Sequence, residues 1–343
     1  MQSDIFSKST DVKIAVIGGG TGSFTVLSGL KNYTRKIVAL VNMADDGGST
    51  GKLRDELGAL PPGDVRQCLV ALSRTPELRD LFNYRFDGGS LSGHAFGNLF
   101  LTALEKMTGD FGKAVELASE VLNIAGVVEP TTLSNVKLGL RNGKGKDVIG
   151  EFEIAHRSFN GDRPSLFLTP EPKANPRAIQ AIEEADLVVI APGNLYGSLA
   201  PALLVPGIGK ALARAKGKKI YVCNLVTKPG QTDNFDVVDF AEEIERLAGG
   251  AFLDIILYNT EQPSADLLKK YAKDGEKSVS VSSKRLKQAP YTILGANLLS
   301  GEIWENTNAS DPIAAARTLI RHDPDAVAKA IMGLHRSESD AVY

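Results

Sequence analysis

The sequence has few of the residues that bind transition metals or form disulfides. Cys68 and Cys223 are its only cysteines, far apart and without metal-ligand neighbours, so it indicates neither a disulfide framework nor a zinc site. Its four histidines are scattered and show no HExxH-type spacing. We expect both cysteines to be small buried hydrophobes in a reducing cytoplasm.

An excess of charge of one sign and a long apolar run are also lacking. The 343 residues carry a formal net charge of −2 and no long basic run, which argues against nucleic acid as the main partner. No stretch approaches the roughly 20 apolar residues that cross a bilayer, and residues 1–11 lack the apolar segment of a secretory signal. We therefore expect a cytoplasmic protein with no nucleic-acid partner and no membrane insertion.

What the sequence does contain is an alternation of apolar runs and helical patterns. Continuous runs of Val, Ile and Leu separated by helices are typical of a parallel sheet that is covered on both faces. Five such runs predict strands at 12–18, 36–42, 185–193, 218–224 and 252–259. The sequence therefore predicts an α/β fold with a mostly parallel sheet.

Helix signals lie between these runs. Asn175 is placed as an N-cap with Pro176 in the first turn, and Asp64 and Gln67 have the spacing of a capping box. Helices are predicted over 64–73, 93–107, 110–122 and 175–185.

Residues 136–155 break the alternation. Glycine-rich turn residues lie there between two alternating runs, a pattern typical of a hairpin. We interpret it as an antiparallel excursion at the sheet edge. The predicted organisation is a single domain over 12–335 with flexible termini at 1–11 and 336–343.

The loops that follow the strands carry the functional signal, because ligands of open α/β sheets bind beyond the carboxyl ends of the strands. The first two, GGGTGS (18–23) and MADDGGSTG (43–51), are rich in small residues whose backbone N–H groups can face an anion. A purely structural tight turn is the alternative. The phosphate-binding candidates in these loops are Gly19, Gly20, Thr21, Gly22, Gly48, Ser49 and Thr50.

Two familiar phosphate-binding signatures nearly fit and both fail. Counted from Gly18, the dinucleotide fingerprint G-x-G-x-x-G has Ser23 where its third glycine belongs. A P-loop fails because GGSTGKL (47–53) is one residue short and Leu53 follows Lys52. The sequence therefore disfavours an ordinary Rossmann dehydrogenase and a Walker ATPase.

Asp45 and Asp46 are adjacent carboxylates at a strand end. Such a pair can hold a hydrated Mg²⁺, which takes one or two carboxylates and shares phosphate oxygens. A nucleoside hydroxyl is an alternative partner, and a turn in which aspartate caps local amides is a structural one. In an enzyme, the same two residues would be the catalytic candidates.

Further polar candidates lie at later helix starts. Asp64 and Arg66 follow a Pro-Pro-Gly turn, and Arg66 could bind phosphate bidentately or pair with a surface acid. His94 and Asn98 are four residues apart, so they share one helical face. We expect His94 to be a site donor or general acid, or else a helix-capping residue.

The third and fourth loops supply single candidates. Asn194 and Tyr196 lie in APGNLYGS, and Lys228 lies in LVTKPGQTD. Solvated loop residues are the alternative, so these assignments depend on the first two loops.

Six stretches in this order resemble the CofD-like family, and within it the YvcK branch of gluconeogenesis factors. They are AVIGGGTGSFTVLSGLK (15–31), ADDGGSTGKLRDELGALPPGDVRQCLVALS (44–73), GHAFGNLFLTAL (93–104), APGNLYGSLAPALLVPGI (191–208), CNLVTKPGQTDNF (223–235) and RHDP (321–324). The resemblance covers about residues 12 to 335. It implies a Rossmann-like three-layer α/β/α fold, a homodimer and a cytoplasmic location.

The resemblance also implies a ligand. The family's enzymes, the 2-phospho-L-lactate transferases, move a phospholactyl group from a guanosine diphosphate carrier to a deazaflavin alcohol with Mg²⁺. Resemblance to the YvcK branch implies instead a protein that binds UDP-sugars such as UDP-N-acetylglucosamine. Proteins of this branch are needed for cell shape and wall synthesis during growth on gluconeogenic carbon.

Residue by residue, the resemblance places the diphosphate contacts on the GGGTG loop and the acidic site on Asp45 and Asp46. In the YvcK branch, a tyrosine in Y-x-x-x-G and the arginine before His-Asp are linked to the nucleotide-sugar; here these are Tyr271 and Arg321. The sequence thus leaves two hypotheses: a nucleotide-sugar-binding regulatory protein, or a Mg²⁺-dependent transferase acting on a nucleoside-diphosphate-linked substrate.

Overall fold

The structure is a computed structural model that describes residues 11–143, 145–301 and 320–339. Within them, seven parallel strands form the central sheet, in the order β10-β9-β8-β7-β1-β2-β3. Their bounds are β1 (Ile14–Gly18), β2 (Ile37–Val41), β3 (Val127–Pro130), β7 (Leu187–Ile190), β8 (Lys218–Val222), β9 (Ile255–Asn259) and β10 (Thr292–Ala296). The strand order reverses between β1 and β7, so the switch point where such sheets bind ligands lies there.

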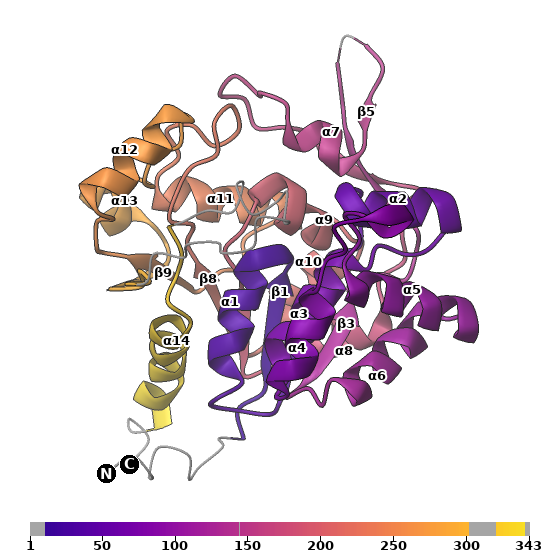
Figure 1. Ribbon diagram of the computed structural model, residues 1–343. Coiled ribbons are helices and arrows are strands. Elements are labelled where there is room, and N and C mark those ends of the chain that lie inside the picture. Colours follow the sequence, from indigo (N-terminus) through magenta and orange to yellow (C-terminus); the bar gives the residue numbers. More distant parts are fainter. Residues whose placement is uncertain (1–10, 144, 302–319, 340–343) are drawn as a thin grey trace.

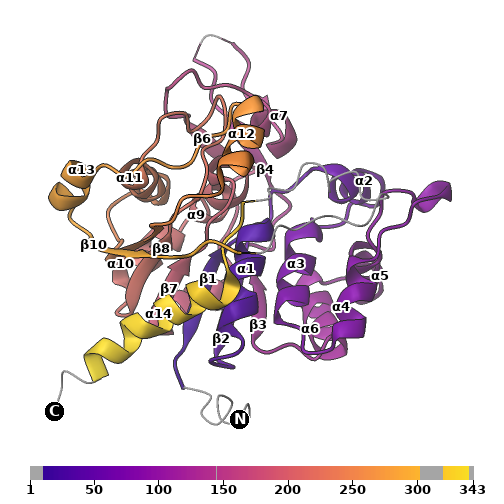
Figure 2. The same ribbon diagram turned by 60° about the vertical axis from the view of Figure 1, so that its left-hand side comes forward.

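Helices cover both faces of this sheet, because successive strand residues point to opposite faces. Ile14 and Val16 of β1 enter one apolar cluster, and Ala15 and Ile17 enter the other. In Figures 1 and 2 the two helical layers lie on either side of the strands, with α14 beside α1.

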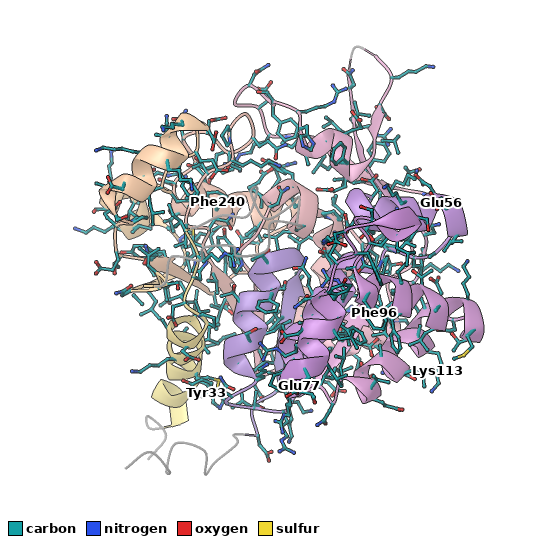
Figure 3. All side chains as sticks on the ribbon, viewed as in Figure 1. Tyr33, Glu56, Glu77, Phe96, Lys113 and Phe240 are labelled. Atoms are coloured by element: carbon teal, nitrogen blue, oxygen red, sulfur yellow. The ribbon has the colours of Figure 1, made fainter. Side chains whose placement is uncertain are left out.

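The helices of the first layer pack around Ile14 and Val16. They are α1 (Gly20–Leu30), α3 (Gly63–Leu72), α4 (Pro76–Asn83), α5 (Phe96–Thr108), α6 (Phe111–Val121) and α14 (Pro324–Ser339). The second layer consists of α8 (Pro176–Glu184), the π-helical turn η2 (Leu195–Leu199), α9 (Ala200–Leu203), α10 (Ile208–Arg214) and α11 (Val237–Ala248). Figure 3 shows Phe240 of α11 in the interior and Lys113 of α6 at the periphery.

The remaining helices lie outside these two layers. They are α2 (Gly48–Leu57), the 3₁₀ turn η1 (Gly89–Leu91), α7 (Glu151–Ala155), α12 (Ala265–Lys273) and α13 (Ser283–Gln288). Of these, α2 and α7 lie together near the top of Figure 1, on the side where the strands end.

The α/β fold, the five predicted strands and the parallel sheet are confirmed. Two strands of this sheet, β3 and β10, escaped prediction, and both form its edges, where one neighbour and partial exposure relax the need for a long apolar run. Asn175 does cap its helix, since its side chain accepts the Arg177 backbone N–H.

The predicted capping box at Asp64 is wrong. Pro62 occupies the N-cap position of α3 and Asp64 lies within the first turn. Its carboxyl group therefore does not cap its own helix, and is free to face the loop after β1.

The excursion at 136–155 is partly as predicted. β4 (Lys137–Leu140) pairs antiparallel with β5 (Val148–Ile149), but also with β6 (Leu166–Thr169), so these strands form a separate small sheet and not an extension of the main edge. The second predicted run ends instead in the short helix α7. Tertiary contacts described below hold that helix.

Among the described residues, no single helix is long and apolar enough to cross a membrane. One bent pair, Leu195–Leu203 with Ile208–Arg214, passes that test of length and composition together, at an angle of 75°. Its apolar side chains pack in the second core cluster.

Candidate functional site

The loop after β1 begins helix α1. Gly19 is the N-cap and Gly20 has a φ of +61°, a left-handed conformation that side chains rarely adopt. Gly22 has another role, because a Cβ there would lie 1.7 Å from the Pro192 carbonyl oxygen of the loop after β7. Gly20 thus shapes the loop, while Gly22 lets α1 pack against its neighbour. Thr21 is exposed at the same helix end.

Asp64 of α3 lies directly against this loop. A Cβ on Gly19 would be 2.2 Å from Asp64 Oδ2. The Asp64 carboxyl group accepts hydrogen bonds from the Gly20 backbone N–H and the Asn42 side chain. An acid therefore occupies the helix N-terminus, the position where an anionic ligand is favoured.

Three carboxyl groups, Asp45, Asp64 and Glu151, form what we call the acidic group. Burial raises the pKa of Asp64 to about 8, and the charges of Asp45 and Glu151 add to this. Burial also raises the pKa of Glu151 to about 7, helped by Asp45 and Asp46 and opposed by Lys228. The pKa of Asp45 is raised by burial, against hydrogen bonds from Gly47 and Thr50.

Lys228 is the cation that the site holds near Glu151. Burial lowers the pKa of Lys228, while Glu151 and Glu276 act in the opposite direction. The loop after β8 therefore approaches the acidic group through Lys228.

Asp46 has a structural role that its neighbour does not share. Its two carboxylate oxygens accept the backbone N–H groups of Glu151 (3.1 Å) and Phe152 (2.8 Å), the first residues of α7. At the other end, Gln231 Nε2 donates to the carbonyls of Ile154 and Ala155. Residues from the loops after β2 and β8 thus hold both ends of α7 and bring Glu151 to the site.

Asp45 and Asp46, the predicted Mg²⁺ ligands, differ in what they bond to. In the part of the chain that the structure describes, no group of three or more His, Cys, Asp or Glu side chains is placed to hold a metal ion. Asp46 already uses both oxygens on α7. Asp45 and Asp64, whose charges interact, fit a Mg²⁺ that is also bound by ligand phosphates and water.

A chain of hydrogen bonds, which we call the relay, lies beside the acidic group. The Ser49 hydroxyl lies 3.0 Å from His94 Nδ1 and accepts from Asn98 Nδ2 at 3.2 Å. Asn98 Oδ1 in turn accepts from Arg66 Nε at 3.0 Å. His94 lies just before α5 and does not cap it, since the N-cap is Ala95.

The relay fixes directions as well as contacts. Arg66 can only donate, so the Asn98 oxygen faces Arg66 and the Asn98 amide faces Ser49. Arg66 is 5% exposed and also donates to Asn83 Oδ1 at 2.5 Å. Arg66 therefore orients the loop after β2 through Asn98, and its guanidinium is buried, so it is not a surface group.

Gly48 and Thr50 flank Ser49 in this loop. Gly48 opens α2 with a φ of +47° and is exposed, while the buried Thr50 hydroxyl bonds to Asp45. The first turn of α2 therefore contacts both the acidic group and the relay.

Asn194 and Tyr196, two other predicted residues, belong to the same turn but have different surroundings. Asn194 caps η2 by accepting the Gly197 backbone N–H at 3.2 Å. Tyr196 is fully buried in the second core cluster, edge-on to Phe159 at 5.2 Å between ring centroids. The structure does not bring the Tyr196 side chain to the loops.

Tyr271 contacts the residue that precedes Arg321 in the chain. The Tyr271 hydroxyl accepts the Ile320 backbone N–H at 2.9 Å, next to Arg321 in the chain. The Arg321 carbonyl accepts the Ser300 backbone N–H, also at 2.9 Å. Both residues therefore border the end of the sheet beyond β8 and β9.

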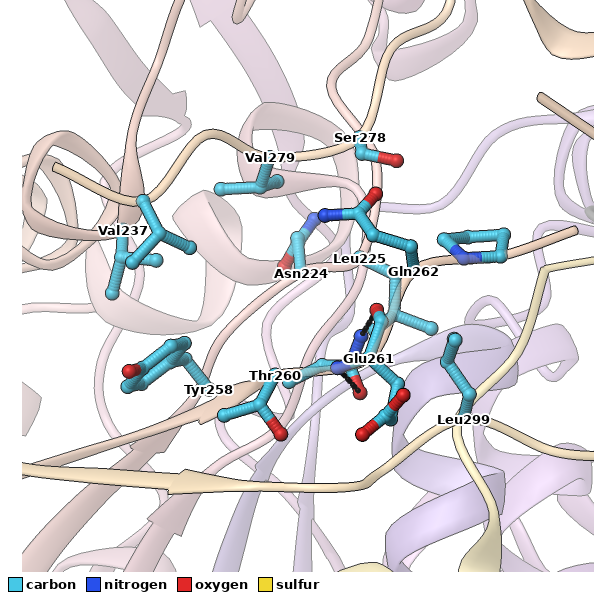
Figure 4. Close-up of a pocket in the computed structure, with 13 residues that line it drawn as sticks. Asn224, Leu225, Val237, Tyr258, Thr260, Glu261, Gln262, Ser278, Val279 and Leu299 are labelled. Atoms are coloured by element: carbon cyan, nitrogen blue, oxygen red, sulfur yellow. Dashed lines mark hydrogen bonds between the residues drawn. The ribbon is translucent and has the colours of Figure 1, made fainter. Parts of the chain in front are cut away.

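A cavity of about 300 Å³ lies at that end of the sheet (Figure 4). Its lining comes from the ends of β8 and β9 and from the segment between α12 and α13. The lining residues are Asn224, Leu225, Val237, Tyr258, Asn259, Thr260, Glu261, Gln262, Pro263, Ser278, Val279, Val281 and Leu299.

Sequence reasoning missed Glu151, Asn42 and the cavity. Glu151 belongs to a segment that was interpreted as a strand, so its place at a helix start gave no signal. Asn42, the last residue of a predicted strand, was a detectable signal, because polar residues at strand ends face the ligand crevice.

The chain is similar to known proteins in sequence and in fold. The pattern of the family 2-phospho-L-lactate transferase CofD matches residues 14–299. A gluconeogenesis factor of Bacillus subtilis (strain 168) is 40% identical over 325 residues, covering 94% of this chain and 98% of the relative. One from Halalkalibacterium halodurans is 42% identical over 277 residues, covering 80% and 85%. A crystal structure of a UPF0052 family member from Bacillus halodurans superposes with a TM-score of 0.84 at 37% identity, covering 95% of this chain and 100% of that one.

Proposed function

Because the chain belongs to the CofD family and is a homologue of the gluconeogenesis factors, we propose that it is a regulatory protein that binds a nucleotide-sugar such as UDP-N-acetylglucosamine. In this proposal the bound state supports cell shape and wall synthesis during growth on gluconeogenic carbon, and the protein acts as a homodimer.

One observation carries the proposal: a helix N-terminus, an acidic group and a cavity lie along one edge of the sheet. The N-terminus of α1 favours an anion such as a diphosphate. The Gly20 N–H donates to the Asp64 carboxyl group, so this amide already faces an anionic group, and a ligand phosphate would take the place of that carboxyl group. Lys228 adds a donor near Glu151, and the His94 ring lies beside Ser49.

A Mg²⁺ ion fits this arrangement through Asp45 and Asp64. When bound, it would neutralise carboxylates that burial disfavours and would link them to phosphate oxygens. The chain's own residues bind and orient the ligand: the loop after β1 at the diphosphate, and the Ser49–His94 pair at the side of the crevice.

A calorimetric titration with UDP-N-acetylglucosamine, with and without Mg²⁺, tests the proposal. We expect binding by the parent protein and none by Gly20→Val, because a valine cannot keep the left-handed conformation that opens the loop.

Gly58→Val is the matched control. Gly58 also has a φ of +61°, but it follows the last turn of α2, and a Cβ at this position would meet no other atom within 4 Å. The control should lose stability to a similar degree and bind normally. Unchanged affinity in Gly20→Val would contradict the assignment of the loop.

The second candidate is a Mg²⁺-dependent transferase acting on a nucleoside-diphosphate-linked substrate. The observation that favours it is the acidic group, since Glu151 and Asp64 have pKa values of about 7 and about 8. Carboxyl groups that titrate near neutral pH suit general acid–base catalysis.

A further inference from the structure

The side chains of the relay are buried and held in place by contacts on several sides. Arg66, Asn98 and His94 are 5%, 3% and 7% exposed. The Arg66 guanidinium donates to Asn83 Oδ1 as well as to Asn98 Oδ1. Its apolar stem lies against α5, since a Cβ on Gly97 would be 2.8 Å from Arg66 Cδ. The heavy atoms of the relay therefore have little freedom, and their positions decide where its hydrogens lie.

The His94 backbone is fixed by the loop that leads into α5. The Phe86 N–H donates to the His94 carbonyl at 3.0 Å, and the His94 N–H donates to the Leu91 carbonyl at 2.9 Å. The ring can then move only by rotation about its side-chain bonds. The contact of its Nδ1 with the Ser49 hydroxyl at 3.0 Å restricts that rotation.

Arg66 sets the direction of every hydrogen bond in the relay. A guanidinium can only donate, so Asn98 Oδ1 accepts from it and Asn98 Nδ2 donates to the Ser49 oxygen. The Ser49 hydroxyl has one hydrogen to donate, and among the described residues its one acceptor is His94 Nδ1. If Nδ1 carried a proton, the Ser49 oxygen would face two N–H donors and its own hydrogen would lose that acceptor.

The tautomer of His94 follows from this direction. A neutral histidine ring carries its proton on one nitrogen, and the partner of the other nitrogen decides which one. Because Nδ1 accepts from Ser49, the proton belongs on Nε2. No described residue bonds to His94 Nε2. The relay thus leaves an N–H donor beside the first turn of α2, where the Thr50 hydroxyl bonds to Asp45.

We propose that Arg66, Asn98 and Ser49 are positioning residues that keep the neutral His94 ring protonated on Nε2, and that this N–H donates to a phosphate oxygen of the bound ligand. The donor role rests on the proposed function, whereas the tautomer is a property of the free protein. A phosphate gains more from such a donor than a neutral group does, because hydrogen bonds to charged groups are stronger.

Nuclear magnetic resonance of the protein with nitrogen-labelled histidine tests the tautomer at about pH 8, where histidine rings are ordinarily neutral. We expect His94 Nε2 to be protonated and His94 Nδ1 to have the chemical shift of an unprotonated nitrogen. The signals of His94 are identified by their loss in His94→Gln. A protonated Nδ1 in the parent protein would overturn the proposal.

Asn98→Asp should reverse the relay. A carboxylate cannot donate, so it would accept from Arg66 and from the Ser49 hydroxyl, and the Ser49 oxygen would accept from a protonated His94 Nδ1. The same spectra should therefore show the proton on Nδ1. Ser49→Ala removes the partner of Nδ1 and should give a mixture of both tautomers. A role of Asn98 and Ser49 in packing alone predicts neither change.

Calorimetric affinity for UDP-N-acetylglucosamine with Mg²⁺ tests the donor. His94→Phe removes it and should weaken binding roughly tenfold to hundredfold, the worth of a hydrogen bond to a charged group. His94→Gln has an amide N–H that can take the place of Nε2–H, and should recover part of this loss. Ser49→Ala should weaken binding by less than His94→Phe, and Ser49→Thr, which keeps the hydroxyl, should bind like the parent.

Thr102→Val serves as the control for these variants. Thr102 lies one helical turn beyond Asn98 on α5 and is 3% exposed, and its hydroxyl makes no hydrogen bond within the part of the chain that the structure describes. The variant should change neither the tautomer of His94 nor the affinity. Its melting temperature shows what a conservative change among these buried side chains does to stability.

The possible outcomes separate the two parts of the proposal from the proposed function. Parent-like tautomers in both Ser49→Ala and Asn98→Asp would overturn the positioning role. Parent-like affinity in His94→Phe would overturn the donor role and leave the proposed function standing. Failure of the parent protein to bind UDP-N-acetylglucosamine would overturn the proposed function together with the donor role, while the spectra of the free protein would still decide the positioning role.

Discussion

At the scale of single residues, Asp64 combines burial with charge. It is 8% exposed and lies beside Asp45 and Glu151, and these causes raise its pKa to about 8. In the unfolded chain the same carboxyl group ionises near pH 3.8. Between these two values the folded protein binds more protons than the unfolded chain, so stability falls as the pH rises.

Asp64→Asn should remove the part of the pH-dependent loss of stability that the Asp64 carboxyl group causes. We expect the free energy of unfolding of the parent to decrease from pH 5 to pH 8 and the decrease to be smaller in the variant, because asparagine does not ionise. Urea denaturation at several pH values measures the slope. Part of the slope should persist up to about pH 7 through Glu151.

Glu56→Gln provides the control for this experiment. It removes one negative charge at an exposed position of α2, away from the acidic group. An Asp64→Asn variant with the same slope as Glu56→Gln would show that Asp64 ionises normally in the folded protein.

At the scale of elements, the short helix α7 depends on residues outside itself. Five residues form too few internal hydrogen bonds to be stable alone. Asp46 caps its N-terminus and Gln231 bonds to its last carbonyls. The helix is therefore a product of tertiary contacts, which explains why its own sequence indicated a strand.

The two adjacent aspartates should respond in opposite ways to substitution. Asp46→Ala removes a helix cap and should lower the free energy of unfolding by about 0.5–2 kcal/mol, with near-normal ligand affinity. Asp45→Asn relieves charge repulsion and should leave the free protein at least as stable. It should weaken ligand binding roughly tenfold to hundredfold, because a charged partner is lost.

Melting temperature and calorimetric affinity of the two variants check this pair of outcomes. The assignment of a cap to Asp46 and a ligand contact to Asp45 would fail if Asp46→Ala lost affinity and Asp45→Asn lost stability.

At the scale of the whole molecule, a binder and a transferase differ in what happens to the ligand over time. We expect UDP-N-acetylglucosamine to remain intact after incubation with the protein and Mg²⁺, measured by chromatography of the nucleotide. Stoichiometric loss of the sugar, or transfer to a deazaflavin acceptor, would favour the transferase. Gly20→Val, which should not bind, reports any turnover that does not depend on the site.

The sequence predicted the interior of this fold better than its borders. Strands buried on both faces, such as β1 and β7, have long apolar runs that identify them. The edge strands β3 and β10 have weaker patterns, and α7 requires Asp46 from far along the chain. Local sequence patterns identify strands that are buried on both faces. They do not identify edge strands or a helix that depends on a residue far along the chain.

The same division applies to the candidate site. The loop after β1 and the Asp45–Asp46 pair were visible because their residues are consecutive. The acidic group was not, because Asp45, Asp64 and Glu151 come from three separate segments that only the fold brings together. Tyr196 shows the opposite case, since its place in a site loop gave no information on the direction of its side chain.

The contact between Asp46 and α7 also provides an internal reporter. The backbone N–H groups of Glu151 and Phe152 donate to Asp46, so their hydrogens exchange with deuterium only when that contact opens. Glu151 belongs to the acidic group. A ligand or cation that moves the Glu151 side chain toward Asp45 and Asp64 would therefore change how often the contact between Asp46 and the first turn of α7 opens. Deuterium uptake of the peptide that contains these two residues would then follow site occupancy without any label on the ligand.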